Sequence, residues 1–400
     1  MTTIFEGLKV IDCSSFIAAP GAATVLSDFG ADVIKIEPPG TGDAGRNLSR
    51  LPGNPKTDQS YGWLLDNRNK RGIVIDLAQA EGQAVLHRLA SEADVFITNY
   101  PLAVRKKLGL GYETLSKAND RLVYASFTGY GERGAEAAKP GFDMTAYWAR
   151  SGLMDGCRPD ASLPPARALT GMGDHPSAIS LFGAIMVGLY QRERTGRGSQ
   201  VGSSLIANGF WANSFNVQAA LCNATFFPRP PREQLFNALT AYYRCGDGKW
   251  LILTILNEER QWPVLAKCLG REALLDDPRF AKQADRFKHA KELIAELDAA
   301  FAARDRDEWR GILNAAGLVF EIVATSEDTA SDQQAIDAGV LVPFENDTLM
   351  TVDSPLYVQG ATKVRPRKAP EVGQHTDQIL AEAKYGADEI ARLRAANIVK

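Results

Sequence analysis

Residues 7–37 read GLKVIDCSSFIAAPGAATVLSDFGADVIKIE and contain two kinds of local pattern. Residues 7–13 and 31–37 are short apolar runs rich in β-branched side chains, as is typical of buried parallel strands. Between them a helical pattern over residues 22–29 ends at Gly30. A strand, a helix and a second strand in this order predict two parallel strands joined by a crossover helix.

The alternation of strand and helix patterns continues along the first half of the chain. Further strands are expected at residues 71–77, 94–99 and 121–127, with a helix over residues 81–93. This alternation predicts an α/β fold with an open, parallel, doubly wound sheet, which binds ligands at the carboxyl ends of its strands. No G-x-G-x-x-G motif follows the first strand, so a dinucleotide-dependent dehydrogenase lacks support.

A chain of 400 residues is too long for one ordinary core, so two domains are expected. We predict a large domain over residues 1–200, a linker over residues 201–232 and a smaller α+β domain over residues 233–325. Residues 201–222 show the pattern of one more helix. A hairpin is expected around residues 245–248, where Cys-Gly-Asp-Gly separates two apolar runs.

The composition argues against several classes of protein. A net charge of −3, with 45% hydrophobic and 23% charged residues, indicates a soluble globular protein whose main partner is not nucleic acid. Five scattered cysteines, without a C-x-x-C pair or a signal peptide, indicate a reducing compartment, so we expect a cytoplasmic protein. The four histidines lack metal-ligand spacing, and the longest apolar run, residues 178–190, is too short to cross a membrane. We therefore expect no metal and no membrane partner.

Residues 169–197, LTGMGDHPSAISLFGAIMVGLYQRERTGR, place an acid just before a long apolar helix. Asp174 follows Gly173, and Pro176 and Gly196 are the expected start and stop signals of the helix. Apolar residues occur on every face of this segment, which predicts a deeply buried helix. Spacing alone favours Asp174 as a helix N-cap, while a carboxylate held on a glycine-rich turn also suits nucleophilic catalysis.

Several short motifs occur in order along the chain, and each alone is a weak signal. They are residues 7–42, Asn69-Lys70-Arg71, Asn99, Gly129-Tyr130-Gly131, Gly141-Phe142-Asp143, Gly173-Asp174, Thr195-Gly196-Arg197-Gly198 and Gly373-Gln374-His375-Thr376. Together they resemble the class III CoA-transferases, a family that includes formyl-CoA transferase, the carnitine CoA-transferases and α-methylacyl-CoA racemase. The resemblance implies a Rossmann-like large domain built from both ends of the chain, so that residues 326–400 return to complete it. It also implies a homodimer of two interlocked chains.

The resemblance implies an activity, the transfer of CoA from an acyl-CoA donor such as succinyl-CoA to a carboxylic acid. The nucleophile of the family corresponds to Asp174. Its carboxylate attacks the thioester to form a mixed anhydride, and the CoA thiolate returns to give an aspartyl-CoA thioester, which passes CoA to the acceptor acid. We expect a lowered pKa for this carboxyl group, because the anion is the nucleophile at neutral pH. Coenzyme A enters as a substrate, and no metal is implied.

One position separates two chemistries within the family. The racemases carry a histidine where this chain has Phe142, and a phenyl ring cannot move a proton. His175 adjoins Asp174, but neighbouring side chains at a helix start usually point apart. The alternatives that remain are an acyl-CoA isomerase, either a 2-methylacyl-CoA racemase or an enzyme that moves CoA within one dicarboxylate, and a CoA-binding protein without catalysis.

The resemblance also implies contacts with CoA. Phe16, Ile17 and Ala18 match the family segment that lies against the adenine and pantetheine groups. The other candidates are Asn69, Lys70, Arg71, Asn99, Lys107, Leu108, Lys139, Phe142 and Asp143. The cationic candidates suit the phosphates of CoA, although lysines are ordinarily solvated surface residues. Pro38 stands where formyl-CoA transferase has an arginine, so one contact of that enzyme is absent.

Two features bear on the acceptor acid. The oxalate-specific members of the family have a run of glycines ahead of the position of Asn237, and this chain lacks that run, so oxalate is not expected. Arg46, Arg50 and Arg167 suit a distal carboxylate through bidentate pairing, although each equally suits a surface ion pair. These arginines predict a dicarboxylic acceptor such as succinate or mesaconate.

Overall fold

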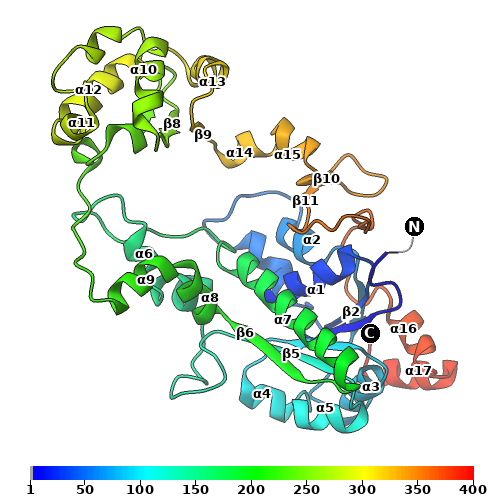
Figure 1. The fold of residues 1–400 in the computed structure, drawn as a ribbon. Helices are drawn as coiled ribbons and strands as arrows, with labels where there is room; N and C mark the ends of the chain where they lie inside the picture. The colour runs from blue at the N-terminus through cyan, green and yellow to red at the C-terminus, as the bar shows by residue number, and fades with distance from the viewer. Residues whose placement is uncertain (1–2) are drawn as a thin grey trace. The chain divides into compact units, whose positions relative to one another are not determined.

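The computed structural model describes residues 3–400, which divide into two compact units (Figure 1). The large unit comprises the described residues through Gly156, together with Arg167–Ala224 and Ile336–Lys400. The small unit comprises Cys157–Ala166 and Thr225–Ala335. The chain therefore leaves the large unit and returns to it.

The large unit is built on a six-stranded parallel sheet (Figure 1). In spatial order its strands are β3 (Arg71–Val74), β2 (Asp32–Glu37), β1 (Lys9–Asp12), β4 (Val95–Thr98), β5 (Val123–Thr128) and β6 (Gln200–Ser204). The order 3-2-1-4-5-6 is that of a doubly wound sheet, whose winding reverses between β1 and β4. The loops that follow these two strands diverge, so a ligand is expected at this carboxyl edge.

Helices and short segments surround this sheet. The helices are α1 (Ala18–Asp28), α2 (Tyr61–Asn67), α3 (Ala80–Ser91), α4 (Leu102–Lys107), α5 (Tyr112–Ala118), α6 (Leu153–Gly156), α7 (Asp174–Thr195), α8 (Leu205–Ala212), α9 (Ser214–Leu221), α16 (Thr376–Glu382) and α17 (Ala387–Ala395). The unit also contains a 3₁₀ turn at Ala44–Arg50, a π-helical segment at Asp143–Ala149 and an antiparallel pair of strands, β10 (Leu341–Pro343) and β11 (Met350–Val352).

Side-chain alternation along the strands explains why both faces of the sheet are covered. Val10, Val33 and Val95 share one core with α1 and α7. The residues that follow Val10 and Val33, Ile11 and Ile34, join a second core with α3, α5, α16 and α17. Because both faces are buried, these strands read as nearly continuous apolar runs in the sequence.

The last residues of the chain belong to the large unit. Ile379 and Leu380 of α16 and Leu393 of α17 are buried in the same core as the strands. Just beyond β3, the N–H of Asp76 donates to the carbonyl oxygen of Ile398 at 2.8 Å. The C-terminal segment thus completes the large unit beside β3.

The small unit has an antiparallel sheet of β7 (Tyr242–Arg244), β8 (Trp250–Leu253) and β9 (Phe320–Val323), in that order. Its helices are α10 (Glu258–Cys268), α11 (Gln283–Lys288), α12 (Ala290–Phe301), α13 (Arg306–Ala315) and α14 (Ser326–Thr329), while α15 (Gln333–Asp337) spans the boundary between the units. Its core is apolar and rich in aromatic side chains. The hairpin expected around residues 245–248 is confirmed by the pairing of β7 with β8.

The expectation of one helix over residues 201–222 is wrong. Gln200–Ser204 forms β6, parallel to β5, and α8 and α9 follow it. The strand has little apolar signal because it lies at the sheet edge and consists largely of small residues. Gly202 lets it approach β5, since a Cβ at that position would lie 2.6 Å from the carbonyl oxygen of Ser126. The segment expected to be a linker therefore begins inside the sheet.

The prediction that the long helix is buried on every side is also wrong. The buried residues of α7 are Ser177, Ala178, Leu181, Ile185, Gly188 and Arg192. Val187 and Tyr190, in contrast, are 67% and 66% exposed. The helix thus packs along a narrow face and leaves an apolar face uncovered. Neither α7 nor any other helix within residues 3–400 is long and apolar enough to cross a membrane.

Candidate active site

The glycine-rich turn before α7 makes Asp174 the first residue of that helix. Gly171 has a φ of 84°, in the region that favours glycine, and Gly173 occupies the N-cap position. A Cβ at Gly173 would lie 2.3 Å from Oδ1 of Asp143 and 2.5 Å from Tyr147, so a larger residue does not fit. Within residues 3–400 no hydrogen bond reaches the Asp174 carboxylate, so this acid is not the helix cap.

Three carboxyl groups gather around this turn: Asp174, Asp143 of the π-helical segment and Asp66 of α2. The N–H of Gly173 donates to Oδ2 of Asp143 at 3.2 Å, while Oδ1 is buried without a hydrogen-bond partner in the described chain. Burial raises the pKa of Asp174 to about 7, and the negative charges of Asp143 and Asp66 act in the same direction. Burial also raises the pKa of Asp143. The expectation of a lowered pKa for Asp174 is therefore wrong, because burial and neighbouring acids oppose its ionisation.

His175 supplies a positive charge to this group. Its Nε2 lies 3.0 Å from Oδ1 of Asp66, whose side chain is buried. Burial lowers the pKa of His175, but the bond to Asp66 and the charge of Asp174 outweigh burial and raise that pKa above its usual value. Nothing in the local sequence marks Asp66, because its partner lies 109 residues away. No cluster of three or more histidine, cysteine or acidic side chains in the described chain is arranged to hold a metal ion.

The turn after β1 places Phe16 opposite Phe142. Phe16 has a φ of 69°, a left-handed conformation that is unusual for a bulky residue. The Asp43 carboxylate stabilises this conformation by accepting from the N–H of Phe16 at 3.3 Å and from the hydroxyl of Ser15 at 2.7 Å. The rings of Phe16 and Phe142 meet edge to face, 5.8 Å between centroids, and both are exposed. Two exposed aromatic rings are thus available to an apolar or stacked group of a ligand.

Asn99, which follows β4, holds the same turn through hydrogen bonds. Its Oδ1 accepts from the N–H of Ser15 at 2.9 Å, and its Nδ2 donates to the carbonyl oxygen of Ser15 at 2.7 Å. Ile17 and Ala18 are both buried at the start of α1. A Cβ at Gly171 would lie 3.7 Å from Cδ1 of Ile17, so the turn after β1 adjoins the turn before α7. Asn99 thus shapes this turn, and the expected contacts of Asn99, Ile17 and Ala18 with CoA stay predictions.

Lys70 is not available to a ligand. Its ammonium group is fully buried and donates to Oδ2 of Asp12, to the carbonyl oxygens of Pro20 and Asp66 and to Oδ1 of Asn67, at 2.7–2.9 Å. The expected contact of Lys70 with CoA stays a prediction, and the burial of its ammonium group argues against it. This lysine connects the end of β1 to α1 and α2.

Asn69 and Arg71 also bind groups of the protein itself. The Asn69 Oδ1 accepts from the N–H of Arg367 at 2.7 Å, and its own N–H donates to the carbonyl oxygen of that residue. Arg71 forms a two-bond pair with Asp32, the first residue of β2, and a further bond to Glu382 of α16. The Arg71 guanidinium therefore lies toward the amino end of β2, away from the carboxyl edge. The expected contacts of both residues with CoA stay predictions.

Three further candidates lie at or near the surface. Lys107 ends α4 and is exposed without an ion pair in the described chain, while Leu108 is half-buried against the core. Lys139 is exposed, 3.2 Å from Glu136, and its Nζ lies 4.8 Å from the ring centroid of Tyr130. The contacts of these three residues with CoA stay predictions.

Of the arginines considered for a distal carboxylate, Arg46 is already paired. It forms a two-bond pair with Glu37 at 2.7 Å and lies over the ring of Trp63, 3.8 Å from the centroid. Arg50 and Arg167 are exposed and form no ion pair within residues 3–400. The dicarboxylate prediction therefore depends on these two arginines.

Known proteins resemble this chain over nearly its whole length. Residues 5–376 match the model of CoA-transferase family III. The chain is 32% identical over 403 residues to (R)-2-hydroxy-4-methylpentanoate CoA-transferase of Clostridioides difficile, covering 99% of this chain and 100% of that protein. It is 29% identical over 410 residues to succinyl-CoA:glutarate CoA-transferase of Mus musculus, covering 99% and 90% of the two chains. The crystal structure of a CAIB/BAIF family protein from Brucella suis matches with a TM-score of 0.86 and 27% identity, over 96% of this chain and 100% of that chain. The chain therefore belongs to CoA-transferase family III.

Proposed function

We propose that this CoA-transferase moves CoA from an acyl-CoA donor to a carboxylic acid through a thioester formed on Asp174. The position of Asp174 carries the proposal. Its carboxylate starts α7 without a hydrogen bond in the described chain, and Gly173 connects it to the segment that presents Phe142. A buried acid with a structural role is usually capped or paired, whereas a nucleophile must keep a free oxygen.

The reaction proceeds by acyl exchange at Asp174. An oxygen of Asp174 attacks the thioester carbon of the donor, the C–S bond breaks, and a mixed anhydride and the CoA thiolate result. The thiolate attacks the Asp174 carbonyl carbon, the donor acid leaves as its carboxylate, and an aspartyl-CoA thioester remains. The acceptor carboxylate attacks this thioester, and the released thiolate attacks the acyl carbon of the acceptor, which frees the Asp174 carboxylate. Each step replaces one activated acyl bond by another, so no ATP is consumed.

The surroundings of Asp174 suit this chemistry. Burial and the charge of Asp143 disfavour the Asp174 anion, so its conversion into an uncharged anhydride or thioester relieves an unfavourable charge. His175, held by Asp66, acts in the opposite direction and keeps part of Asp174 ionised near neutral pH. The N–H of Gly173 is already used by Asp143, so it is not free to stabilise an oxyanion.

We place CoA at the carboxyl edge of the sheet, against the turn of Phe16, Ile17 and Ala18. The exposed rings of Phe16 and Phe142 support this placement, because they offer apolar surface beside Asp143 and Asp174. Lys107, Leu108 and Lys139 remain candidates for further contacts, the lysines with the phosphates of CoA.

The acceptor is a carboxylic acid. The relatives named for (R)-2-hydroxy-4-methylpentanoate and for glutarate suggest a branched hydroxy acid and a dicarboxylic acid respectively. The dicarboxylic acid predicted from the sequence would depend on Arg50 and Arg167, which are exposed. Racemisation has little support, since Phe142 has no group that can accept or donate a proton and Nε2 of His175 is hydrogen-bonded to Asp66. Migration of CoA within one dicarboxylate would use the same Asp174 carboxylate.

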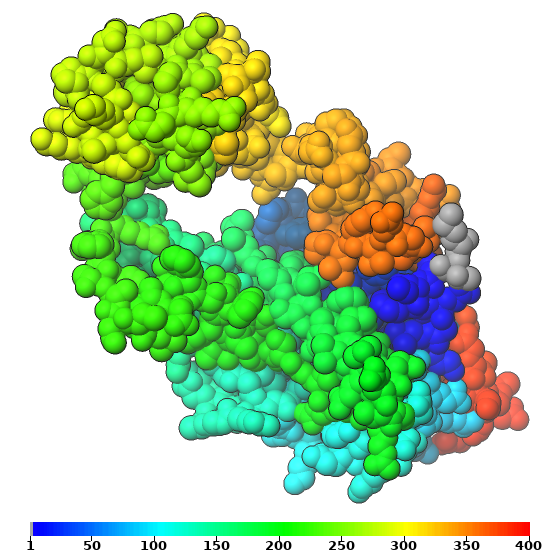
Figure 2. All heavy atoms as spheres, viewed as in Figure 1, coloured from blue at the N-terminus to red at the C-terminus, as the bar shows by residue number. Residues whose placement is uncertain are grey.

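We also propose that the protein is a cytoplasmic homodimer, with the interlocked chains that the resemblance implies. Exposed apolar residues of α7, α8 and α9 support an interface on the large unit, within the segment coloured green in Figure 2. Val187, Tyr190, Trp211 and Phe215 are 67%, 66%, 79% and 88% exposed. Soluble monomers rarely leave a large apolar patch uncovered. Sedimentation equilibrium should give twice the chain mass of 43.4 kDa, and a monomer at micromolar concentration would contradict this proposal.

Mass spectrometry of CoA thioesters tests the proposed function. The protein would be mixed in D₂O with succinyl-CoA and a pool of monocarboxylic and dicarboxylic acids. We expect a new acyl-CoA with the unchanged protein and with Asp120→Ala, an exposed acid away from the turn, but none with Asp174→Ala. Acid-quenched protein should carry CoA on the peptide that contains Asp174. Deuterium in a 2-methylacyl-CoA, without any new thioester, would contradict the proposal and support the racemase.

A further inference from the structure

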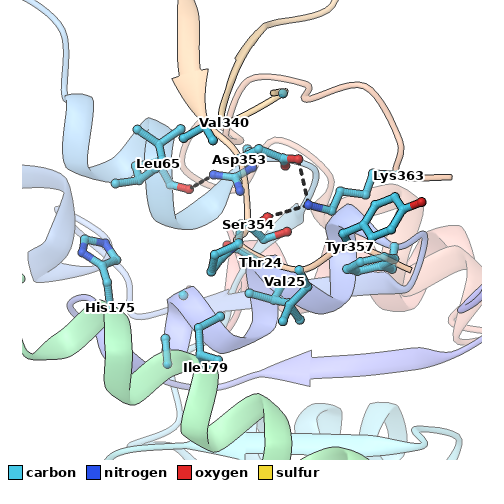
Figure 3. A pocket seen from close by; sticks show the side chains of 18 of the residues that line it. Thr24, Val25, Leu65, His175, Ile179, Val340, Asp353, Ser354, Tyr357 and Lys363 are labelled. Carbon is cyan, nitrogen blue, oxygen red and sulfur yellow. Dashed lines mark hydrogen bonds and ion pairs between the residues drawn. The ribbon is translucent and has the colours of Figure 1, made fainter. Parts of the chain in front are cut away.

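A large cavity in the large unit is lined by His175, the residue that follows the candidate nucleophile in the chain (Figure 3). It lies between α1, the first turns of α7 and the segment of residues 338–363. Its volume is about 900 Å³, within the range of sites that enclose small organic ligands. On the basis of the proposed function, we infer that this cavity, the acyl pocket, receives the hydrocarbon chain of the acceptor acid and selects apolar monocarboxylic acids.

The walls of the acyl pocket are mostly apolar. Figure 3 shows Val25 of α1 and Ile179 of α7 below the cavity and Val340 above it. Tyr357, also in the lining, is 87% exposed, and Val340 is 48% exposed. Apolar surface in this cavity therefore remains uncovered within the described chain. A hydrocarbon chain that covers it removes both its own surface and that of the pocket wall from water, which favours binding.

One end of the acyl pocket is lined by His175, the residue after Asp174 in α7. His175 and Asp66 both line this end, and a hydrogen bond of 3.0 Å joins them. Asp174 immediately precedes His175, and Pro176 and Ala178 continue the wall along α7. An acid whose carboxyl group reaches Asp174 would therefore extend its chain past His175 into the pocket.

The two cations farther inside the pocket are paired with groups of the protein. Arg68 donates two hydrogen bonds to Asp28, at 2.9 and 2.6 Å. Lys363 donates to Asp353 at 2.8 Å and to the carbonyl oxygen of Ser354 at 2.5 Å, as the dashed lines in Figure 3 show. The Arg68 guanidinium group and the Lys363 ammonium group therefore each have a carboxylate partner already.

His175 is the third basic side chain of the lining, and it is held by Asp66. All the lining residues are described, and none of their basic groups is left to receive a second carboxylate of a substrate. Burying an unpaired carboxylate in an apolar cavity is unfavourable by several kcal/mol or more. The acyl pocket thus fits an acid with one carboxyl group and a hydrocarbon chain, and it disfavours the dicarboxylic acid predicted from the arginines.

The first experiment measures KM and kcat for a series of acceptors with succinyl-CoA as the donor. The acids are acetate, butanoate, hexanoate, octanoate and glutarate. Each methylene that enters the pocket should lower KM by about fourfold, so octanoate should be the best acceptor of the series and glutarate a poor one. Titration calorimetry of octanoate with the protein, without CoA, provides a readout that does not depend on turnover.

The second experiment fills the pocket. Ile179→Trp and Val340→Trp should raise KM for octanoate at least about tenfold and weaken its binding in the calorimeter, while KM for acetate changes less than about twofold. Leu349→Trp is the matched control, because Leu349 belongs to the same β10–β11 region as Val340 but does not line the pocket. This variant should behave as the unchanged protein with both acids.

Three outcomes would overturn the inference. The first is a KM that does not fall as the acceptor chain lengthens, and the second is a lower KM for glutarate than for octanoate. The third is an equal rise in KM for acetate and for octanoate in the Ile179→Trp variant. Sedimentation of that variant identifies the competing occupant, since dissociation into monomers would show that a second copy of the chain fills the cavity. Failure of the proposed function is distinct, because the unchanged protein would then form no acyl-CoA from any acid.

Discussion

Two groups of buried carboxylates in the large unit differ in their counter-charges. The paired cluster consists of Asp12 and Asp43 with Lys35 and Lys70. Lys35 lies 2.8 Å from Asp43, and Lys70 lies 2.8 Å from Asp12. Burial alone would raise the pKa of both acids, but the lysines outweigh burial and hold both pKa values below the usual range. These acids stay ionised and have a structural role, which for Asp43 is to hold the left-handed turn at Phe16.

The second group, Asp66, Asp143 and Asp174, is called the unpaired cluster because Asp143 and Asp174 have no ion pair in the described chain, although His175 pairs with Asp66. Here burial and the neighbouring carboxylates raise the pKa of Asp174 to about 7 and burial raises that of Asp143. A carboxylate held between lysines has its oxygens occupied, whereas one with weak compensation keeps an oxygen free to react. The difference teaches that burial leaves an acid ionised where lysines surround it and opposes its ionisation where they do not, and the second environment is the one that the proposed chemistry uses.

Breaking the paired cluster should have the largest effect on stability. Lys35→Met leaves Asp43 buried without its cation, and such a loss typically costs about 3–5 kcal/mol. Urea denaturation at pH 7 measures the change. The control is Lys9→Met, which removes an exposed pair with Glu92 and should cost less than about 1 kcal/mol. Equal losses of unfolding free energy in the two variants would show that the buried pair stabilises the fold no more than the exposed pair does.

Removing charge from the unpaired cluster should stabilise the fold. The Asp174 carboxyl group ionises more easily in the unfolded chain, because its pKa in the fold is raised from 3.8 to about 7. Its contribution to stability therefore falls as pH rises between these two values and stays low above them. Asp174→Asn removes this penalty, so the free energy of unfolding should increase by about 1–3 kcal/mol at pH 8 and by less at pH 5. Lower stability of the variant at pH 8, in urea denaturation, would contradict this account.

The pH dependence of activity should report the unpaired cluster. In the proposed mechanism the Asp174 anion is the nucleophile, so kcat/KM should rise with pH around a midpoint near 7. Asp143→Asn removes a negative neighbour and should move this midpoint to lower pH, with several-fold higher activity at pH 6. His175→Gln removes a positive neighbour and should move the midpoint to higher pH. A displacement in the same direction in both variants would exclude an electrostatic cause.

The smallest effects on KM are expected from substitution of two cations, Arg71 and Lys107. Arg71→Ala should leave KM for succinyl-CoA within about twofold of the unchanged value, because Arg71 is paired with Asp32 and Glu382. Lys107→Ala should raise that KM by about threefold if this exposed lysine contacts a phosphate of CoA. Steady-state kinetics with varied donor concentration measures both. A larger rise in KM in the Arg71→Ala variant would support the contact between Arg71 and CoA that is expected from the sequence.

Much of the fold was predictable, because local patterns encode it. β1, β2, β4 and β5 are apolar, β-branched runs, and their expected positions are confirmed to within a few residues. β6 was not recognised, since Gln200–Ser204 has small and polar side chains and is a strand only through its pairing with β5. The uncovered face of α7 was not predicted either, because apolar residues there mimic the pattern of a buried helix.

The candidate site was predictable in part. Phe16 and Phe142, expected to lie at one site, are in contact in the structure, and Asp143 reaches the backbone of Gly173 beside Asp174. The partner of Lys70 was not predictable, because a lysine suited to a phosphate is equally suited to a buried carboxylate such as Asp12, and only its surroundings distinguish the two.

The sequence by itself determined the parallel α/β sheet and the placement of one acid on a glycine turn before a long helix. Both depend on residues close together in the chain, so periodicity, glycine and proline encode them directly. Only the tertiary structure decided the ionisation of that acid and the use of each cation. Those properties depend on charges that arrive from separate elements, as Asp66 of α2 and Asp143 of the π-helical segment reach the start of α7. Coulomb interaction and burial act through space, and no local pattern of residues records them.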